Sequence, residues 1–178
     1  MEDDKILEVG CGSGGVLQQF FNWGASAQNL NGIDLLSDRL VEAKARLSQA
    51  GIVNANGEWL PYPQGYFDIV MQFTAFSSIL DTEVKMRIAK EMLRVLRPDG
   101  LILWYDFWLN PTNKQTQGIQ PAEVRALFPG CQYEFHKITL APPITRRIVR
   151  FSWVFASLLE SMQIFNTHYL VLIRKDGG

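Results

Sequence analysis

The sequence is poor in cysteine and carries no excess of charge of one sign. Its two cysteines, Cys11 and Cys131, are too few for a disulfide framework or a zinc site, which favours a reducing compartment. The 17 lysines and arginines are balanced by 18 aspartates and glutamates, which leaves a formal net charge of −1. Because such a chain offers no basic field to a nucleic-acid backbone, we expect no nucleic-acid partner.

Long apolar runs are also missing. No stretch approaches the roughly 20 apolar residues of a membrane-spanning helix. The acidic start, residues 1–4, lacks the apolar core of a signal peptide. No His, Cys, Asp and Glu residues show metal-ligand spacing, so we expect no metal. The 178 residues, 47% of them hydrophobic and 20% charged, indicate one globular domain over residues 1–178, expected in the cytoplasm.

The segment 6–17 predicts a short buried strand, a glycine turn and a helix that runs to about Trp23. The glycines leave backbone N–H groups accessible at a helix N-terminus, where an anionic ligand group is favoured. Two nucleotide-type interpretations fit these glycines. The dinucleotide pattern is met by Gly10, Gly12 and Gly15, and the tighter S-adenosylmethionine (SAM) pattern by Gly10, Gly12 and Gly14. The glycines alone do not choose between them.

Strand and helix patterns alternate along the rest of the chain. Strands are expected at 30–34, 52–56, 67–73, 101–107, 132–140 and 168–173, and helices at 37–50, 82–96, 121–128 and 143–163. Ser37 is the expected N-cap of the second helix, and Asp81 or Thr82 that of the third. This alternation predicts a parallel sheet covered by helices on both faces.

Four landmarks in this order resemble the class I SAM-dependent methyltransferases, in particular their small-molecule branch. They are the glycine loop at 7–14, the strand end Gly32-Ile33-Asp34, the loop and strand at 57–70, and the helix, turn and strand at 93–101. The resemblance covers residues 6 to about 173. It implies an α/β fold with a Rossmann-like, doubly wound, seven-stranded sheet, mostly parallel, with one antiparallel strand near the C-terminus. Residues 142–163 are then a helical insertion between the last two strands.

The resemblance implies SAM as methyl donor, with S-adenosylhomocysteine (SAH) as product. The methionine end is expected on the glycine turn, formed by Gly10, Cys11, Gly12, Ser13 and Gly14. Glu8 positions this turn or pairs with the ammonium group, or else is a purely structural acid. Asp34 is placed to accept hydrogen bonds from two ribose hydroxyls; its alternative role, as an N-cap, is already filled by Ser37.

The adenine and sulfonium ends have their own candidates. Leu35 is expected to flank the adenine, and Glu58 falls where the family more often has Asp, near the adenine amino group. Trp59 is either a wall of the adenine site or a core residue. Gln72 and Phe73 end the fourth strand near the sulfonium, where an aromatic face favours a cation.

Methyl transfer is an in-line displacement, so most of the acceleration comes from alignment. A base is needed only when the acceptor is a hydroxyl or a protonated amine. Asp106 and Tyr105, at the end of the fifth strand, are the expected catalytic residues, and Ser77 or Ser78 could orient an acceptor. His136 is the other titratable candidate for the base, with a structural role as the favoured alternative, and a structural role is expected for His168.

The sequence therefore predicts SAM-dependent methyl transfer to a small-molecule or lipid- or glycan-linked acceptor, at oxygen. The alternatives are a SAM-binding module without catalysis and, more distantly, an NAD(P)-dependent oxidoreductase. Segment 142–163 is interpreted as a cover for the sheet edge, a wall of the acceptor pocket, or a peripheral membrane contact. The helices that usually precede the family's first strand are missing before Lys5. We therefore expect an open cofactor site that binds SAM weakly and permits a homodimer.

Overall fold

The computed structural model describes residues 1–109, 116–140 and 166–176. The strands, in chain order, are β1 (Ile6–Val9), β2 (Leu30–Asp34), β3 (Gly51–Asn54), β4 (Phe67–Phe73), β5 (Leu96–Phe107), β6 (Cys131–Leu140) and β7 (Asn166–Lys175). The α-helices are α1 (Gly15–Asn22), α2 (Ser37–Arg46), α3 (Thr82–Val95) and α4 (Pro121–Leu127), with short 3₁₀ turns at Ala27–Asn29 and Phe76–Ser78. None of the described helices is long and apolar enough to cross a lipid bilayer.

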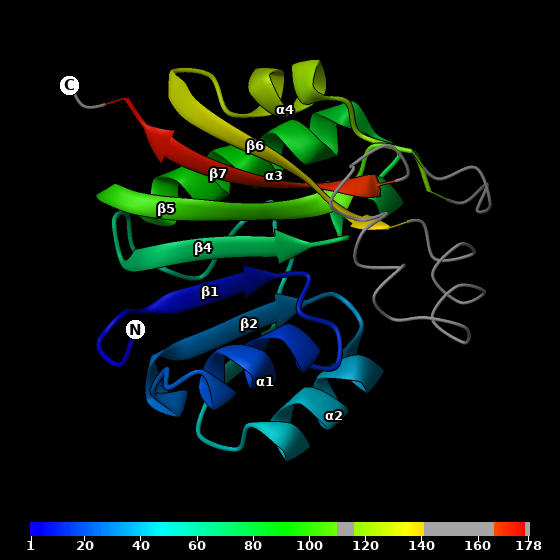
Figure 1. The fold of residues 1–178 in the computed structure, drawn as a ribbon. Helices are drawn as coiled ribbons and strands as arrows, with labels where there is room; N and C mark the ends of the chain where they lie inside the picture. Colours follow the sequence, from blue (N-terminus) through cyan, green and yellow to red (C-terminus); the bar gives the residue numbers. More distant parts are fainter. Residues whose placement is uncertain (110–115, 141–165, 177–178) are drawn as a thin grey trace, which may run out of the picture.

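The strands form one seven-stranded sheet in the order β3-β2-β1-β4-β5-β7-β6 (Figure 1). The pairs from β3 to β5 are parallel, whereas β7 runs antiparallel to both of its neighbours, β5 and β6. The predicted seven-stranded, mostly parallel, doubly wound sheet with one antiparallel strand is therefore confirmed.

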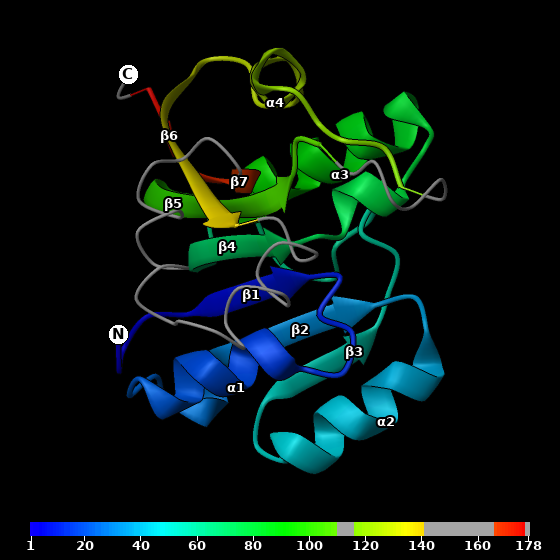
Figure 2. The ribbon, with the colours of Figure 1, turned by 45° about the vertical axis from the view of Figure 1, so that its right-hand side comes forward.

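The strand order reverses between β1 and β4, because the chain first builds outward to β3 and then returns to place β4 beside β1. Arrowheads of β1, β2 and β4 point to the same side in both views (Figures 1 and 2). In open α/β sheets, ligands bind outside the carboxyl ends of the strands at such a reversal point. The loops after β1, β2, β3 and β4 therefore form the expected site edge.

Two apolar cores cover opposite faces of the sheet. Successive strand residues point to opposite faces, so Ile6 packs with one core and Leu7 with the other. The Ile6 core includes buried residues of α1 and α2, and the Leu7 core includes those of α3 and α4. In the second core, the Trp104 ring lies 4.4 Å from that of Phe76 and 5.7 Å from that of Phe128.

Several element boundaries differ from those predicted. β5 begins at Leu96 instead of 101, because Leu96 already pairs with Phe67 before the Pro98–Gly100 turn region continues into the strand. Ser37 is not the N-cap of α2: Leu36 holds that position, and no side chain caps this helix. Asp81 caps α3 as expected, accepting hydrogen bonds from the N–H groups of Glu83 and Val84. The helical insertion predicted at 142–163 lies outside the described residues.

Lys85 is a buried cation that the apolar pattern of α3 did not predict. The apolar residues of α3 at helical spacing are Val84, Ile88, Met92 and Val95, but Val84 is only half-buried, whereas Lys85 is 1% exposed. Its Nζ donates to Glu123 Oε1 on α4, and the Glu123 side chain is 26% exposed. The ion pair therefore joins α3 to α4. Lys85 lies in the interior, and Glu123 is partly exposed to solvent.

This asymmetry predicts unequal costs for breaking the pair. Glu123→Gln leaves the Lys85 ammonium buried without its counter-charge, whereas Lys85→Met leaves a carboxylate that water can still reach. We expect Glu123→Gln to lower the free energy of unfolding by about 2 kcal/mol, discounted for the exposure of Glu123, and Lys85→Met to cost less. Urea unfolding of both variants measures this, and an equal loss in the two would contradict it.

Candidate functional site

The glycine loop after β1 is held by backbone contacts and needs residues without side chains. Gly10, Gly12 and Gly14 have φ angles of +77°, +52° and +76°, in the left-handed region that glycine adopts without strain. A Cβ at Gly10 would lie 2.7 Å from the Cβ of Ala75, in the loop after β4. The Gly10 and Cys11 N–H groups both donate to the Ile33 carbonyl of β2. The loop is therefore fixed against both neighbouring strands.

Asp34, at the carboxyl end of β2, connects this loop to the start of α2. Its Oδ2 accepts a hydrogen bond from Gly12 N–H at 2.8 Å, and its Oδ1 accepts one from Leu36 N–H at 2.9 Å. The second bond orders the chain just before α2. Asp34 therefore takes over part of the role at the start of α2 that was predicted for Ser37 as its N-cap. Each oxygen of a carboxylate has a second lone pair, so two hydroxyl donors can still be accepted.

Glu8 lies on β1 beneath the loop and is 2% exposed. Its Oε2 has no hydrogen-bond partner among the described residues. Burial raises the pKa of Glu8 to about 8, with a smaller rise from nearby Asp34 and an opposing effect of the Leu17 N–H at the start of α1. Burial also raises the pKa of the Cys11 thiol to about 12, so Cys11 acts as a small apolar residue.

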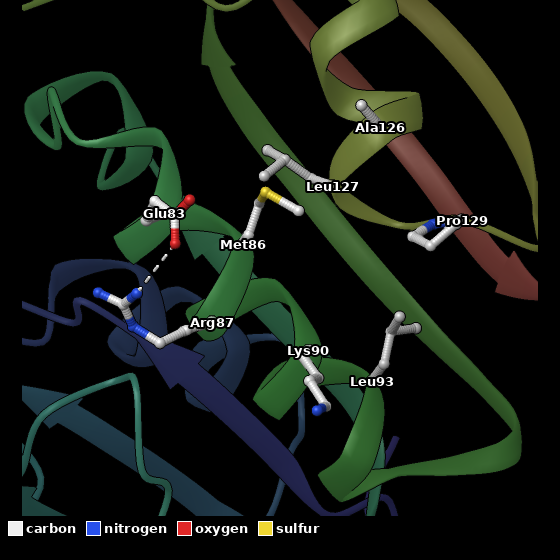
Figure 3. A pocket seen from close by; sticks show the side chains of 8 residues that line it. All are labelled: Glu83, Met86, Arg87, Lys90, Leu93, Ala126, Leu127 and Pro129. Carbon is white, nitrogen blue, oxygen red and sulfur yellow. Dashed lines mark ion pairs between the residues drawn. The ribbon is translucent and has the colours of Figure 1, made fainter.

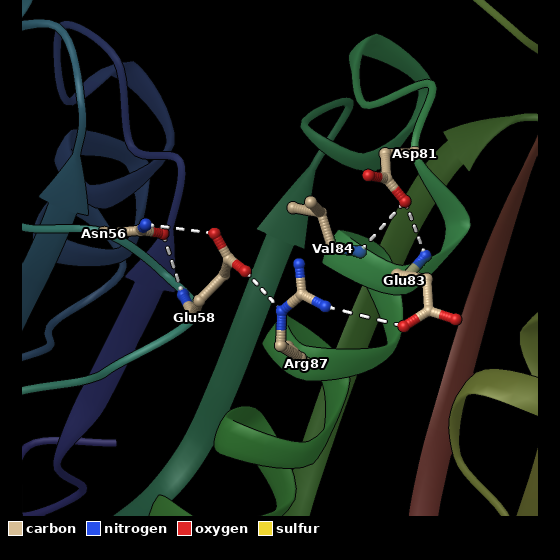
Figure 4. Close-up of polar contacts among 6 residues, drawn as sticks. All are labelled: Asn56, Glu58, Asp81, Glu83, Val84 and Arg87. Atoms are coloured by element: carbon tan, nitrogen blue, oxygen red, sulfur yellow. Dashed lines mark hydrogen bonds and ion pairs between the residues drawn. The ribbon is translucent and has the colours of Figure 1, made fainter.

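The loop after β3 carries Glu58, which is expected near adenine, and Figure 4 shows its polar contacts. Glu58 Oε1 accepts from Asn56 Nδ2 at 3.1 Å, and Glu58 Oε2 accepts from Arg87 Nε on α3, which holds the pKa of Glu58 below its usual range. Both carboxylate oxygens thus already have partners. The Trp59 and Leu35 side chains are exposed, so both are free to cover the ring of a ligand. Asn56, which the sequence interpretation missed, is the first polar side chain after Asn54 ends β3.

At the end of β4, Gln72 is fully buried, and its side chain holds the loop that follows β4. Its Oε1 accepts from Ala75 N–H, and its Nε2 donates to the Tyr105 carbonyl of β5. Thr74 follows with φ +57°, an uncommon conformation for a residue with a side chain. Both ends of the Gln72 amide are thus used inside the protein, and the ligand contact of Gln72 stays a prediction. Phe73 is half-buried, with its ring 5.5 Å from that of Tyr105.

The two predicted catalytic residues point to opposite faces of β5. Asp106 is 1% exposed and accepts hydrogen bonds from the N–H groups of Ser77 and Phe107, and burial raises its pKa. It therefore anchors the loop after β4 and is not presented to an acceptor. Tyr105 lies on the other face with Phe73, and its hydroxyl lies 2.8 Å from Thr139 Oγ1. The structure thus does not bring Asp106 and Tyr105 together.

The histidines occupy different environments. His136, on β6, is exposed and its Nε2 lies 2.9 Å from Glu134 Oε1. His168 lies inside β7, directly opposite Phe107 of β5, and its ring is stacked on that of Tyr105 at 4.8 Å. The sequence interpretation gave His168 a structural role and did not predict these aromatic neighbours. Among the described residues, no three His, Cys, Asp or Glu side chains come together as metal ligands.

A hollow of about 370 Å³ lies between α3 and α4 (Figure 3). Its lining residues are Glu83, Met86, Arg87, Lys90, Leu93, Ala126, Leu127 and Pro129. None of them belongs to the loops after β1, β2 and β4. The hollow is therefore separate from the edge at which the glycine loop and Asp34 meet.

The buried carboxyl of Glu8 predicts a pH-dependent stability. Its pKa in the folded protein, about 8, exceeds the ordinary value of 4.5. Its contribution to the free energy of unfolding is therefore complete below pH 4.5 and is lost as the pH rises through 8. Glu8→Gln cannot ionise, so its free energy of unfolding should gain on that of the wild type by up to about 3 kcal/mol between pH 5 and 8. Denaturant unfolding at both pH values tests this, with exposed Glu42→Gln as the control for losing one carboxyl group. A difference that does not change with pH would refute it.

Comparisons with known proteins agree with this geometry. The family model described as a methyltransferase domain matches residues 7–104. An uncharacterized protein of Haemophilus influenzae is 33% identical over 125 residues, which are 65% of this chain and 47% of that protein. A ubiquinone/menaquinone biosynthesis C-methyltransferase, UbiE, of Francisella philomiragia is 30% identical over 110 residues, 58% of this chain and 43% of the relative. The chain spans less than half the length of these two curated relatives.

Solved structures share the fold. A SAM-dependent methyltransferase from Methanosarcina mazei superposes with a TM-score of 0.71 at 19% identity, covering 98% of this chain and 94% of that one. The family match covers more than half of the 178 residues and includes the glycine loop, Asp34 and the loops after β3 and β4. The chain therefore belongs to the methyltransferase domain family, whose class I members use SAM.

Proposed function

We propose that this chain binds SAM at the carboxyl edge of β1, β2 and β4 and transfers its methyl group to a small-molecule acceptor. The observation that carries the proposal is the hydrogen bond between Gly12 N–H and Asp34. It places bare backbone and an acid with unused lone pairs side by side at the point where the strand order reverses. That combination suits a ligand with a charged amino-acid end and a ribose.

The residues present fit SAM. The positive φ angles at Gly10, Gly12 and Gly14 leave room where side chains would otherwise stand. Glu8 Oε2, which has no partner in the part of the chain that the structure describes, is a buried acceptor beneath the same loop, suited to order the loop or to meet an ammonium group. When bound, SAM supplies a methyl group on a sulfonium whose positive charge is lost on transfer. Asp34 would hold the ribose, and the exposed Leu35 and Trp59 side chains would cover the adenine.

For the acceptor we propose a small molecule with a hydroxyl group. In its support, the half-buried rings of Phe73 and Tyr105 give the site an apolar wall at the end of β4 and β5. Carbon is the competing target atom, supported by the matched relatives named as C-methyltransferases. A lipid- or glycan-linked acceptor, a membrane contact through 142–163, a homodimer and a cytoplasmic location stay predictions.

A SAM-binding module without catalysis is the second candidate. It is favoured by the internal use of Asp106 and Gln72, whose polar atoms hold the loop after β4. Binding of SAH without transfer of a labelled methyl group to any member of a panel of hydroxyl, amine and activated-carbon acceptors would favour it. Labelled product from one such acceptor would instead establish catalysis and identify the methylated atom.

Asp34 is the decisive residue for cofactor binding. Asp34→Ala removes the acceptor for both ribose hydroxyls and also frees Gly12 N–H, so we expect SAH to bind about 10- to 100-fold more weakly. Calorimetric titration with SAH measures this, and Asp38→Ala, an exposed acid in the first turn of α2, is the matched control. Equal SAH affinity in Asp34→Ala and wild type would overturn the proposed function.

Alanine substitutions at Gly12 and Gly15 test whether a ligand lies on the glycine loop. A Cβ at Gly12 approaches only the Arg39 side chain, at 3.9 Å, whereas a Cβ at Gly15 meets nothing within 4 Å. Gly12→Ala should therefore weaken SAH binding by at least tenfold while costing only about 1 kcal/mol of stability for its positive φ. Gly15→Ala, in the first turn of α1, should keep the affinity and stabilise the fold slightly. Unchanged affinity in Gly12→Ala would contradict a ligand lying on this loop.

A further inference from the structure

Four rings form a continuous row on the face of β4, β5 and β7 that carries Phe73. The Phe73 ring lies 5.5 Å from that of Tyr105, and the Tyr105 and His168 rings are parallel within 3° at 4.8 Å. The His168 ring in turn lies 4.0 Å from that of Phe107. Aromatic groups favour offset-stacked and tilted rings at 4.5–7 Å, a range that includes the first two of these contacts. The row leads from the end of β4, beside the glycine loop, to β7.

Thr139, which has a strained backbone, contacts the hydroxyl group of Tyr105 in this row. Thr139 of β6 has φ +64°, which is uncommon for a β-branched residue, and the regular pairing with β7 runs past it from Ile138 to Leu140. Its Oγ1 lies 2.8 Å from the Tyr105 hydroxyl. Strain of this kind persists only where the surrounding structure enforces it, and it is concentrated at functional sites. Thr139 thus points to a function at this end of the row.

His168 is the member of the row whose ring carries nitrogen atoms. It is 4% exposed, and its Nδ1 lies 3.1 Å from the Thr167 hydroxyl. Its Nε2 has no hydrogen-bond partner among the described residues. Burial lowers the pKa of His168 to about 4, so the imidazole is neutral at pH 7. In the tautomer in which Nδ1–H donates to the Thr167 hydroxyl, Nε2 carries a free lone pair and can accept a hydrogen bond.

Among the described residues, the charged groups near His168 do not stabilise a proton on its ring in the free protein. On β6, Glu134 and His136 follow the same alternation as Ile138, which pairs with His168, but they pair with each other. On β5, Asp106 is turned to the other face and bonded to Ser77, and on β6 the Lys137 ammonium lies over the Trp108 ring. Tyr105 is therefore the titratable side chain in ring contact with His168.

We propose that this row is the acceptor site, and that His168 Nε2 accepts the proton of a phenolic hydroxyl as that oxygen is methylated. The inference rests on the proposed function and names its substrate class, a planar aromatic ring with a hydroxyl group. The rings of Phe73 and Tyr105 give such an acceptor a stacking surface, and Nε2 gives its hydroxyl an acceptor.

The step balances in atoms and charge. The phenolic oxygen forms a bond to the methyl carbon while the bond from that carbon to the sulfonium sulfur breaks, and neutral SAH is released. The hydroxyl proton moves to Nε2 and leaves to solvent afterwards. Because the sulfonium loses its positive charge as the imidazole gains one, the net charge of the site does not change. The flanking Tyr105 and Phe107 rings favour the imidazolium through cation–π attraction.

The chain has only two histidines, so a nitrogen-15 histidine label reports on this site directly. With SAH bound, titration with catechol should shift the Nε2 resonance of His168 and leave that of His136 in place. Labelled methyl transfer from SAM to catechol should fall at least tenfold in kcat/KM in His168→Gln, within the range that proton-transfer groups contribute. His136→Gln is the matched control and should keep wild-type activity, and the SAH affinity of both variants should stay within twofold of the wild type.

The outcomes separate the two proposals. If SAH binds but catechol leaves the His168 resonance unchanged, or if His168→Gln methylates catechol as fast as the wild type, this inference is wrong and the proposed function stands. Absence of any transfer to catechol by the wild type also overturns it. If SAH itself fails to bind, the proposed function falls and takes this inference with it. The resonance measurement uses the wild-type protein, so it decides the question even if His168→Gln does not fold.

Discussion

The site depends on one hydrogen bond, from the backbone N–H of Gly12 to the carboxylate of Asp34. It joins the loop after β1 to the end of β2, and the other oxygen of the same carboxylate orders the chain before α2 through Leu36. On the opposite side, the missing side chain of Gly10 lets the loop approach Ala75 after β4. Three loops that are distant in sequence are thus held in one arrangement by the protein alone. A ligand that binds there meets a preformed backbone surface and pays little to order it.

Buried polar groups maintain that arrangement. Gln72 and Asp106 each use their side-chain oxygens to accept backbone N–H groups of the loop after β4. A buried polar group without such partners would cost more than one kcal/mol, so both residues stabilise the loop only in this conformation. Glu8 is different, because one of its oxygens is buried without a partner among the described residues. Gln72 and Asp106 therefore hold the loop after β4 in place, whereas Glu8 keeps one oxygen that a ligand could use.

The sequence predicts well what depends on the local backbone. Apolar spacing located the described strands and α-helices, and the glycine and acid positions pointed to the candidate site, because both reflect backbone geometry that nearby residues dictate. It predicts poorly what depends on which side chains meet across elements. Lys85 interrupts the apolar stripe of α3 because Glu123 reaches it from α4, and Asp106 meets Ser77 across two strands. His168 gained its aromatic neighbours only when β7 paired with β5, a contact between residues about 60 positions apart along the chain.

The ion pair between Arg87 and Glu58 has a mechanical consequence. Arg87 lies on α3 and lines the hollow between α3 and α4, while Glu58 belongs to the loop expected to cover the adenine. The loop and the helix are therefore linked, so a displacement of α3 along its axis pulls on the adenine side of the site. Arg94 of α3 adds to this link, because its guanidinium group donates to the Leu60 and Tyr62 carbonyls of the same loop.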